Sequence, residues 1–251
     1  MLQAGWRGWQ AGVRRWAHAI PMPCLLCGGA ARGARLCAPC REDLLGDAPP
    51  RCRWCALRLA SPDDGCLACT LRTPAYDYAI AAIDYAPPGQ ALVWRAKQSW
   101  QGAAARTVAD LLAEAVARDA RGLPPGCLAL AVPASHRALR RRGYNPAARL
   151  GRICAAHLGL AWSSTLLRAG ADDGLRQHRL GRAQRLERGG ARYVAMGVAP
   201  GQPIALIDDV MTTGSTVEAC ARALKAAGAG PVVVLAVART PAPGAGVPDP
   251  S

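Results

Sequence analysis

The sequence of 251 residues contains no phenylalanine, and Lys97 and Lys225 are the only lysines among its 31 basic residues. It also lacks a long apolar run, because stretches such as PVVVLAVA (231–238) are far shorter than the ~20 residues that a membrane-spanning helix needs. The N-terminal arginines are followed neither by an uninterrupted apolar segment nor by a small-residue cleavage pattern. We therefore expect a cytoplasmic protein with no transmembrane segment and no signal peptide.

The composition that remains is that of a globular, basic protein. Hydrophobic residues make up 51% of the chain and charged residues 19%, which is typical of a packed domain and not of a disordered chain. The arginine bias indicates a GC-rich coding sequence. The formal net charge is nevertheless +14, and such a charge attracts polyanions whichever basic residue carries it.

Eight of the eleven cysteines stand in four C-x-x-C pairs. One pair brings two thiolates onto one metal, and two pairs complete a tetrahedral zinc site with Zn–S distances of about 2.3 Å. Zinc is favoured over disulfides because disulfides are rare in the cytoplasm. Four sulfurs leave no open position, so two structural zinc sites are predicted. Sequential ligation is the simplest, although an interleaved pairing is also open; the predicted ligands are Cys24, Cys27, Cys37, Cys40, Cys52, Cys55, Cys66 and Cys69.

Composition and periodicity divide the chain into four regions. Residues 1–22 repeat apolar residues at three- and four-residue steps, which predicts an amphipathic helix that docks on the protein or binds a membrane surface or partner. A zinc-binding domain is expected at 23–73 and a domain of alternating strands and helices at 74–240, while the tail at 241–251 is expected to be disordered. Strands alternating with helices indicate an α/β fold with a mainly parallel sheet.

The boundaries follow from apolar runs and from glycine and proline. The expected strands lie near 74–86, 127–133, 203–208 and 231–238, the expected helices lie near 89–100, 102–119, 146–158 and 214–227, and residues 164–199 show little periodicity.

The segment IALIDDVMTTGST (204–216) carries the strongest functional signal. IALI is the expected strand and DDVMTTGST the expected loop, and ligands bind where loops leave the carboxyl ends of parallel strands. The hydroxyls, Gly214 and the following helix N-terminus favour a phosphate, whereas Asp208 and Asp209 favour a sugar diol or a hydrated metal. Together these preferences describe a ribose 5-phosphate. The segment lacks the glycine spacing and lysine of a P-loop, which argues against nucleoside triphosphate hydrolysis.

Two acidic residues followed by T-T-G-x-T resemble the phosphoribosyl pyrophosphate (PRPP) signature of type I phosphoribosyltransferases. Similar stretches are AVPASHRALRRRGYN (131–145), LRQHRLGRAQRLERGGARYVA (175–195) and Lys97 in VWRAKQSW. With the cysteine pairs, the chain resembles the ComF competence protein family over roughly residues 20–240. The resemblance implies a type I phosphoribosyltransferase-like parallel sheet with helices on both faces, preceded by a small double zinc-ribbon domain.

The resemblance also implies a role for each part of the site. Asp208 and Asp209 would bind the ribose hydroxyls, and Mg²⁺ would bridge the pyrophosphate. The 5-phosphate would be held by Thr212, Thr213, Gly214, Ser215 and Thr216. The pyrophosphate and Mg²⁺ region would comprise Lys97, Pro133, Ala134, Ser135, His136, Arg140 and Arg142. The chain departs from the family's usual pattern where Tyr144-Asn145-Pro146 and Gly189-Gly190-Ala191 stand.

Residues 137–192 contain thirteen arginines and three acidic residues. With Tyr144 and Trp162 available for base stacking, this excess indicates a single-stranded nucleic-acid surface, although a solvated charged face is the simpler interpretation of a charge run. The arginines assigned to that surface are Arg141, Arg176, Arg179, Arg182 and Arg185.

Three functions remain open. The resemblance favours a PRPP-binding protein that handles incoming single-stranded DNA during natural transformation, with DNA and the uptake machinery as partners. The alternative is a phosphoribosyltransferase that moves ribose 5-phosphate from PRPP to a nitrogen acceptor. No catalytic residue is assigned for it, because no His or Glu stands beside the signature as an evident base. The third is a scaffold that docks partners.

Overall fold

The computed structural model describes residues 21–32, 36–46, 50–61, 66–98, 102–134, 139–140, 143–170 and 193–242. The helix expected at 1–22 and the tail expected at 241–251 fall almost wholly outside these ranges. Among the described residues, no helix is both long and apolar enough to span a membrane.

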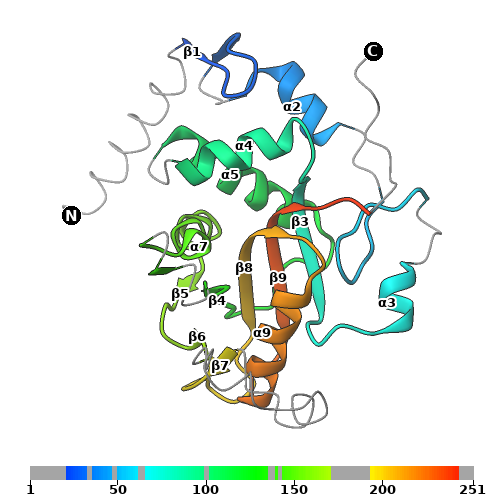
Figure 1. Cartoon of the computed structure of the whole chain (residues 1–251), viewed down its shortest axis with the longest axis vertical. Helices are drawn as coiled ribbons and strands as arrows, with labels where there is room; N and C mark the ends of the chain where they lie inside the picture. Colours follow the sequence, from blue (N-terminus) through cyan, green and yellow to red (C-terminus); the bar gives the residue numbers. More distant parts are fainter. Residues whose placement is uncertain are drawn as a thin grey trace, which may run out of the picture.

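A five-stranded sheet forms the centre of the protein (Figure 1). Every neighbouring pair in it is parallel, as the alternation of strands and helices predicts. A parallel sheet is covered on both faces, so its strands read as continuous apolar runs. In order across the sheet the strands are β3 (Tyr78–Asp84), β9 (Val232–Arg239), β8 (Ile204–Met211), β4 (Leu128–Ala131) and β5 (Ala161–Trp162).

Helices cover both faces of this sheet, which confirms the expected architecture. Side chains along β9 alternate between two cores: Val233 and Leu235 face one, while Val232 and Val234 face the other. The first core is closed by α4 (Gly89–Gln98), α5 (Ala103–Arg118) and α7 (Pro146–His157). The second is closed by α9 (Ser215–Ala226) and by the antiparallel pair β6 (Leu167–Ala169) and β7 (Tyr193–Ala195).

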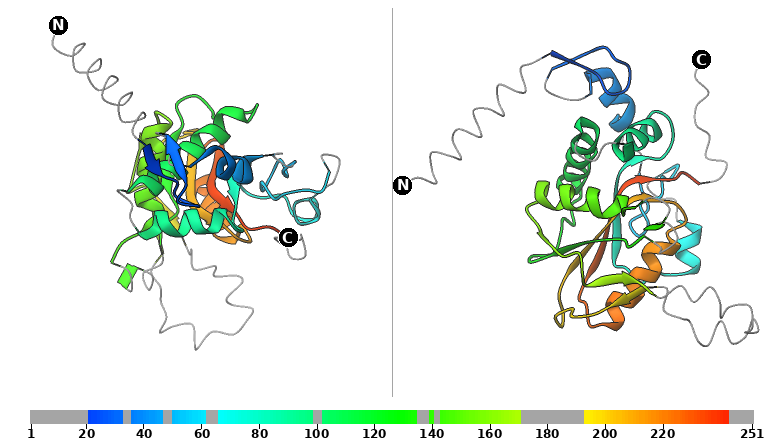
Figure 2. Two further views of the ribbon diagram at one scale, coloured as in Figure 1. Left: turned by 90° about the horizontal axis from the view of Figure 1, so that it is seen from above. Right: turned by 60° about the vertical axis from the view of Figure 1, so that its left-hand side comes forward.

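The cysteine pairs stand in two separate segments. The first contains the antiparallel pair β1 (Pro21–Pro23) and β2 (Ala30–Arg32), followed by α2 (Ala38–Leu45). It lies over α4 and α5, whereas residues 50–61 and α3 (Leu67–Leu71) lie beside β3 and α9 (Figures 1 and 2). Both segments reach β3, but their buried cysteines join different cores, the first under α4 and α5 and the second under α9.

One expected boundary is wrong in a way that matters for the site. The aspartates do not begin a loop, because β8 continues through them to Met211. Its partner decides this: Val210 and Met211 pair with Ala238 and Arg239 of β9, and the Thr240 amide donates to the Met211 carbonyl at 3.0 Å. A prediction based on apolar runs places the end of the strand at the first charged residue. Backbone pairing does not depend on side-chain polarity, so the strand continues.

Candidate functional site

The first four cysteines form a compact cluster. The sulfurs of Cys24, Cys27, Cys37 and Cys40 all lie within 4.8 Å of one another, and those of Cys27 and Cys37 are 3.6 Å apart. Zn–S bonds of about 2.3 Å in a tetrahedron give S–S separations of about 3.8 Å. The amides of Leu26 and Cys37 donate to the Cys24 sulfur at 3.4 and 3.3 Å, which stabilises a thiolate. The cluster fits a structural zinc ion.

The second four cysteines form an equivalent cluster that is more deeply buried. The sulfurs of Cys55 and Cys66 are 3.7 Å apart. All four residues are buried, whereas Cys27 of the first cluster is exposed and Cys37 half-buried. All eleven cysteines of the chain are free. The structure brings the cysteines together in sequential order, as the simpler prediction has it; the second cluster is Cys52, Cys55, Cys66 and Cys69.

The loop after β8 places hydroxyl groups at the N-terminus of α9. Gly214 has φ +80°, and a Cβ there would lie 2.9 Å from the Met211 methyl carbon, so the loop needs glycine at this position. The Thr213 hydroxyl donates to the Ser215 hydroxyl at 3.1 Å and accepts from the Ser215 amide at 3.3 Å. Thr212, Thr213 and Ser215 are exposed. The loop therefore offers its hydroxyls to solvent beside a helix N-terminus, where anions are stabilised.

The two aspartates differ in environment. Asp208 is buried, and this burial, together with the negative charge of Asp209, raises the pKa of its carboxyl to about 8. The carboxylate of Asp209 lies 2.8 Å from the Lys97 ammonium. Lys97 reaches it from the end of α4. We call residues 212–215, from the end of β8 to the start of α9, the hydroxyl loop. The structure thus brings together Asp208, Asp209, Lys97 and the hydroxyl loop at the carboxyl end of β8.

The carboxyl end of β4 lies beside the carboxyl end of β8. Pro133 and Ala134 follow β4, and the amide of Val132 donates to the Ile207 carbonyl of β8 at 2.9 Å. Pro133 and Ala134 border a cavity of about 360 Å³, whose lining also includes Asn145, Trp162, Ser163 and Arg168. Arg140 is exposed and follows Leu139, which lines the same cavity. Ser135, His136, Arg141, Arg142, Arg176, Arg179, Arg182 and Arg185 lie outside the described residues.

The two aromatic residues considered for base stacking already have partners. Trp162 packs against α7, since a Cβ on Gly151 would lie 2.9 Å from its ring. The Arg149 guanidinium covers the Tyr144 ring at 4.6 Å from the ring centroid. Asn145 caps α7 by accepting from the Ala147 amide at 3.1 Å. The structure thus gives all three residues a packing or capping role.

Arg239 is the residue that the sequence analysis missed. It ends β9 and is buried. Its guanidinium donates to the carbonyl of Cys55 at 3.0 Å, of Met211 at 3.1 Å and of Thr240 at 2.9 Å, and also to the carbonyl of Thr212. The available signal was an arginine directly after seven apolar residues of a buried strand.

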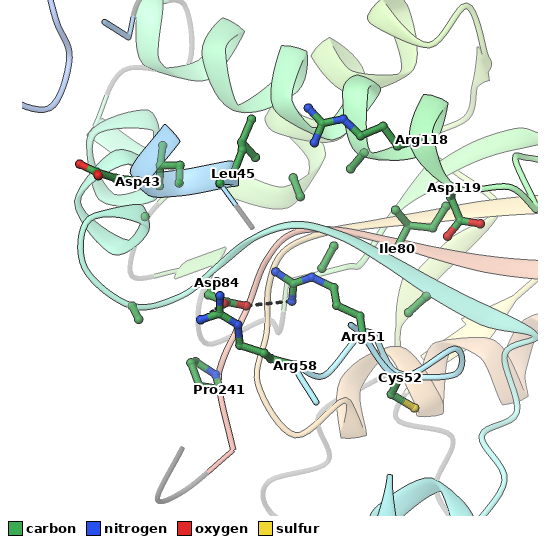
Figure 3. Close-up of a pocket in the computed structure, with 18 of the residues that line it drawn as sticks. Asp43, Leu45, Arg51, Cys52, Arg58, Ile80, Asp84, Arg118, Asp119 and Pro241 are labelled. Carbon is green, nitrogen blue, oxygen red and sulfur yellow. Dashed lines mark ion pairs between the residues drawn. The ribbon is translucent and has the colours of Figure 1, made fainter. Parts of the chain in front are cut away.

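A second cavity, of about 380 Å³, lies between the second cysteine segment, β3 and the ends of α2 and α5 (Figure 3). Arg51 and Arg58 both pair with Asp84, at 2.8 and 3.4 Å, and Figure 3 shows their guanidinium groups beside that carboxylate. Arg121, also in the lining, pairs with Asp119 at 2.6 Å. The two pairs with Asp84 attach the segment around Cys52 and Cys55 to β3 at the edge of the sheet.

Comparison with known proteins gives relatives along most of the chain. No family model matches. The DNA utilization protein YhgH of Salmonella typhi is 31% identical over 191 residues, which cover 75% of this chain and 84% of the relative. Competence protein F of Haemophilus influenzae is 29% identical over 226 residues, or 86% of this chain and 96% of the relative.

Matches among solved structures have low identity and low TM-scores, and several of them are named phosphoribosyltransferases. An allosteric regulatory enzyme of purine biosynthesis is 19% identical with a TM-score of 0.39, covering 53% of this chain and 25% of that enzyme. The adenine phosphoribosyltransferase of Thermoanaerobacter pseudethanolicus is 15% identical with a TM-score of 0.28, covering 51% and 78% of the two chains.

Proposed function

The chain belongs to the ComF competence protein family, with the DNA utilization protein YhgH and competence protein F as relatives, and we propose that it is a cytoplasmic PRPP-binding protein that handles incoming single-stranded DNA during natural transformation. One observation carries the PRPP part of this proposal. The acidic pair, Lys97 and the hydroxyl loop meet at the carboxyl end of β8, where parallel sheets bind their ligands.

Each group has a specific task in binding PRPP. The hydroxyls of Thr213 and Ser215 and the amides at the start of α9 hold the 5-phosphate. Asp208 and Asp209 accept hydrogen bonds from the ribose hydroxyls. Lys97, which pairs with Asp209 in the free protein, is then able to turn toward the pyrophosphate. Carboxylate oxygens are ligands that suit Mg²⁺, which would neutralise the phosphates when bound.

Calorimetric titration with PRPP and Mg²⁺ tests this site. The wild type should bind, and the double variant Asp208→Asn/Asp209→Asn should lose measurable binding because it lacks both carboxylates. The matched control is Asp43→Asn, which removes an exposed carboxylate of α2 and should bind like the wild type. Equal affinity in all three proteins would refute the proposed site.

Both cysteine clusters are proposed to hold structural zinc. The support is the four-sulfur donor set in each cluster, with sulfur separations of 3.6 and 3.7 Å between pairs and no disulfide among the chain's cysteines. Two zinc ions per purified chain is the expected stoichiometry.

The DNA part of the proposal rests on the relatives' names and on the charge. A chain of formal net charge +14 attracts single-stranded DNA. If about five phosphates are neutralised, log K falls with a slope of roughly −3.5 against log salt, or about a hundredfold between 50 and 200 mM. Replacing Arg176, Arg179, Arg182 and Arg185 by Gln should flatten this slope, whereas Arg72→Gln/Arg222→Gln, which changes exposed arginines elsewhere, should leave it nearly unchanged. A slope near zero in the wild type would contradict the DNA role.

A transferase activity is the second candidate. Its support is the cavity of about 360 Å³ beside Pro133 and Ala134, which gives room for an acceptor next to the proposed pyrophosphate site. Such an enzyme works by positioning and by stabilising leaving-group charge. It should release pyrophosphate from PRPP when given its nitrogen acceptor. A broad acceptor screen without pyrophosphate release, in protein that binds PRPP, would exclude it.

A further inference from the structure

The second cysteine cluster and the hydroxyl loop share one buried arginine. Arg239 Nε donates to the carbonyl of Cys55, which is itself a cluster residue, at 3.0 Å. Its Nη1 donates to the carbonyls of Met211, at 3.1 Å, and of Thr212. The guanidinium is therefore in direct contact with both sites.

These bonds decide which way the loop's peptide groups face. A trans peptide unit is planar, and its C=O and N–H point in opposite directions. Arg239 holds the carbonyls of Met211 and Thr212 on its own side, so the amides of Thr212 and Thr213 are directed away from it. That is the side of β8 on which β4 lies, since β9 lies on the other side of β8. Arg239 thus presets amide donors for an anion without touching the anion.

Tyr76 forms a second contact between the same two sites. It is buried in the same apolar core as the four cysteines of the second cluster and Met211. A Cβ on Gly214 would lie 3.7 Å from the Tyr76 hydroxyl. The amide of the preceding residue, Ala75, donates to the Glu218 carboxylate of α9 at 2.7 Å. The chain that leaves the cluster therefore packs on the loop and on the helix that follows it.

We propose that metal on the second cluster and phosphate on the loop are energetically coupled, with Arg239 as the positioning residue between them. Metal holds the turn in which the Cys52 amide donates to the Leu57 carbonyl at 2.8 Å and the Ala56 amide to the Cys52 carbonyl at 2.9 Å. That turn presents the Cys55 carbonyl to Arg239. Without metal the turn loosens, a buried guanidinium loses a partner, and the loop loses its preset geometry.

Coupling of this kind is reciprocal, so phosphate on the loop must also tighten metal binding at the cluster. The first cluster supplies an internal control. Its buried residues Cys24 and Cys40 belong to the core under α4 and α5, and not to the core that contains Met211 and Val217. Its metal should not respond to phosphate on the loop. This inference rests on the proposed PRPP site.

Zinc release to a chromogenic chelator tests the coupling without measuring any catalysis. The first cluster, with its exposed Cys27, should empty in a fast phase and the buried second cluster in a slow phase. Competition with the chelator at equilibrium should show that saturating PRPP with Mg²⁺ tightens zinc binding at the second cluster by about fivefold or more, the usual lower range of allosteric coupling. The slow phase should become slower, and the fast phase should stay unchanged. Calorimetry on the same protein records whether PRPP binds.

Two arginine variants assign the effect. Arg239→Met should abolish the effect of PRPP on the slow phase, and Arg239→Lys should restore only part of it, because an ammonium lacks the planar fork that reaches several carbonyls. The matched control is Arg121→Met. Arg121 donates to the Arg53 carbonyl in the same turn and to the Asp119 carboxylate. These bonds join the turn to Asp119 and not to the hydroxyl loop. This variant should keep the full PRPP effect.

The outcomes are distinguishable. Wild-type protein that binds PRPP yet holds the zinc of its second cluster with unchanged affinity overturns the coupling and leaves the proposed site intact. An equal PRPP effect in Arg239→Met and wild type overturns the role of Arg239. Wild-type protein that binds no PRPP overturns the proposed site and the coupling with it. The wild-type measurement decides the coupling even if Arg239→Met fails to fold.

Discussion

The two cysteine clusters have the same four-sulfur chemistry and nearly the same spacing, but they pack against different parts of the protein. The first joins the core beneath α4 and α5 and leaves Cys27 exposed. The second is wholly buried in the core beneath α9, and its Cys55 carbonyl contacts the arginine that holds the hydroxyl loop. With metal bound as proposed, the same four-sulfur donor set would serve the stability of a segment in one place and the geometry of the proposed PRPP site in another.

Removing one sulfur from each cluster tests this comparison with the largest expected effect. Cys40 and Cys69 are equally buried, at 8% exposure, and each stands in a short helix. Either Cys→Ser variant should lose one zinc ion and several kcal/mol of stability. Only Cys69→Ser should also weaken PRPP binding, by about tenfold or more. Metal analysis gives the zinc content, and calorimetry gives the PRPP affinity. An equal loss of PRPP affinity in the two variants would contradict the proposed difference between the two clusters.

The next largest effect is expected in the pH dependence of folding stability, and it comes from Asp208, which lies just before the hydroxyl loop. Asp208 has a pKa of about 8 in the folded protein against 3.8 in a model peptide. The folded state therefore binds more protons than the unfolded state between these values, so stability should fall as pH rises and level off above about 8. From pH 6 to 8 the decrease should be about 2 kcal/mol. Asp208→Asn should remove this decrease in denaturant unfolding, and a Cys40→Ser background should not change it.

Two glycines offer a matched comparison of smaller size. Gly28 in the first cluster and Gly214 in the loop have φ values of +75° and +80°. Alanine at either position costs about 1–2 kcal/mol for the left-handed backbone. A Cβ at Gly28 meets nothing within 4 Å, whereas one at Gly214 lies 2.9 Å from the Met211 methyl carbon. Gly214→Ala should therefore destabilise more in urea unfolding and also weaken PRPP binding. PRPP affinity reduced by Gly28→Ala as well would contradict this distinction.

The smallest effects are expected from the ion pairs that attach each segment. Arg41 pairs with Glu114 of α5 on the first side, and Arg58 pairs with Asp84 of β3 on the second. Both arginines are nearly half exposed, at 44% and 45%, so each Arg→Ala change should cost less than about 1 kcal/mol. Thermal unfolding in low and high salt measures this. A cost of several kcal/mol on one side alone would mean that the pair, and not the metal, holds that segment.

Sequence patterns recovered the parts of the structure that local rules determine. The C-x-x-C spacing predicts both clusters, and alternating strands and helices predict the parallel sheet. Strand β8 extends beyond its predicted end because its partner β9 continues to pair, and pairing partners are not encoded locally. The strands β5, β6 and β7, of two or three residues each, are too short to show the alternation of apolar and polar residues that predicts a strand.

The candidate site divides in the same way. The hydroxyl loop and the acidic pair are contiguous in sequence and could be located from it. The ion pair of Lys97 with Asp209 spans more than a hundred residues and depends on how α4 packs. Arg239 could not be interpreted from sequence, because its partners at Cys55 and Met211 come from segments that only the fold brings together.

The protonated carboxyl of Asp208 has a consequence for ligand binding itself. At pH 7 the free site holds a proton that an ordinary aspartate would have lost. A ligand that requires the ionised form of Asp208, for example to hold a cation, displaces that proton into solution. Binding should therefore acidify a weakly buffered sample, and the apparent binding enthalpy should change with the ionisation enthalpy of the buffer. The proton released per ligand then reports, without any structure of the complex, whether the ligand has engaged the Asp208 carboxyl.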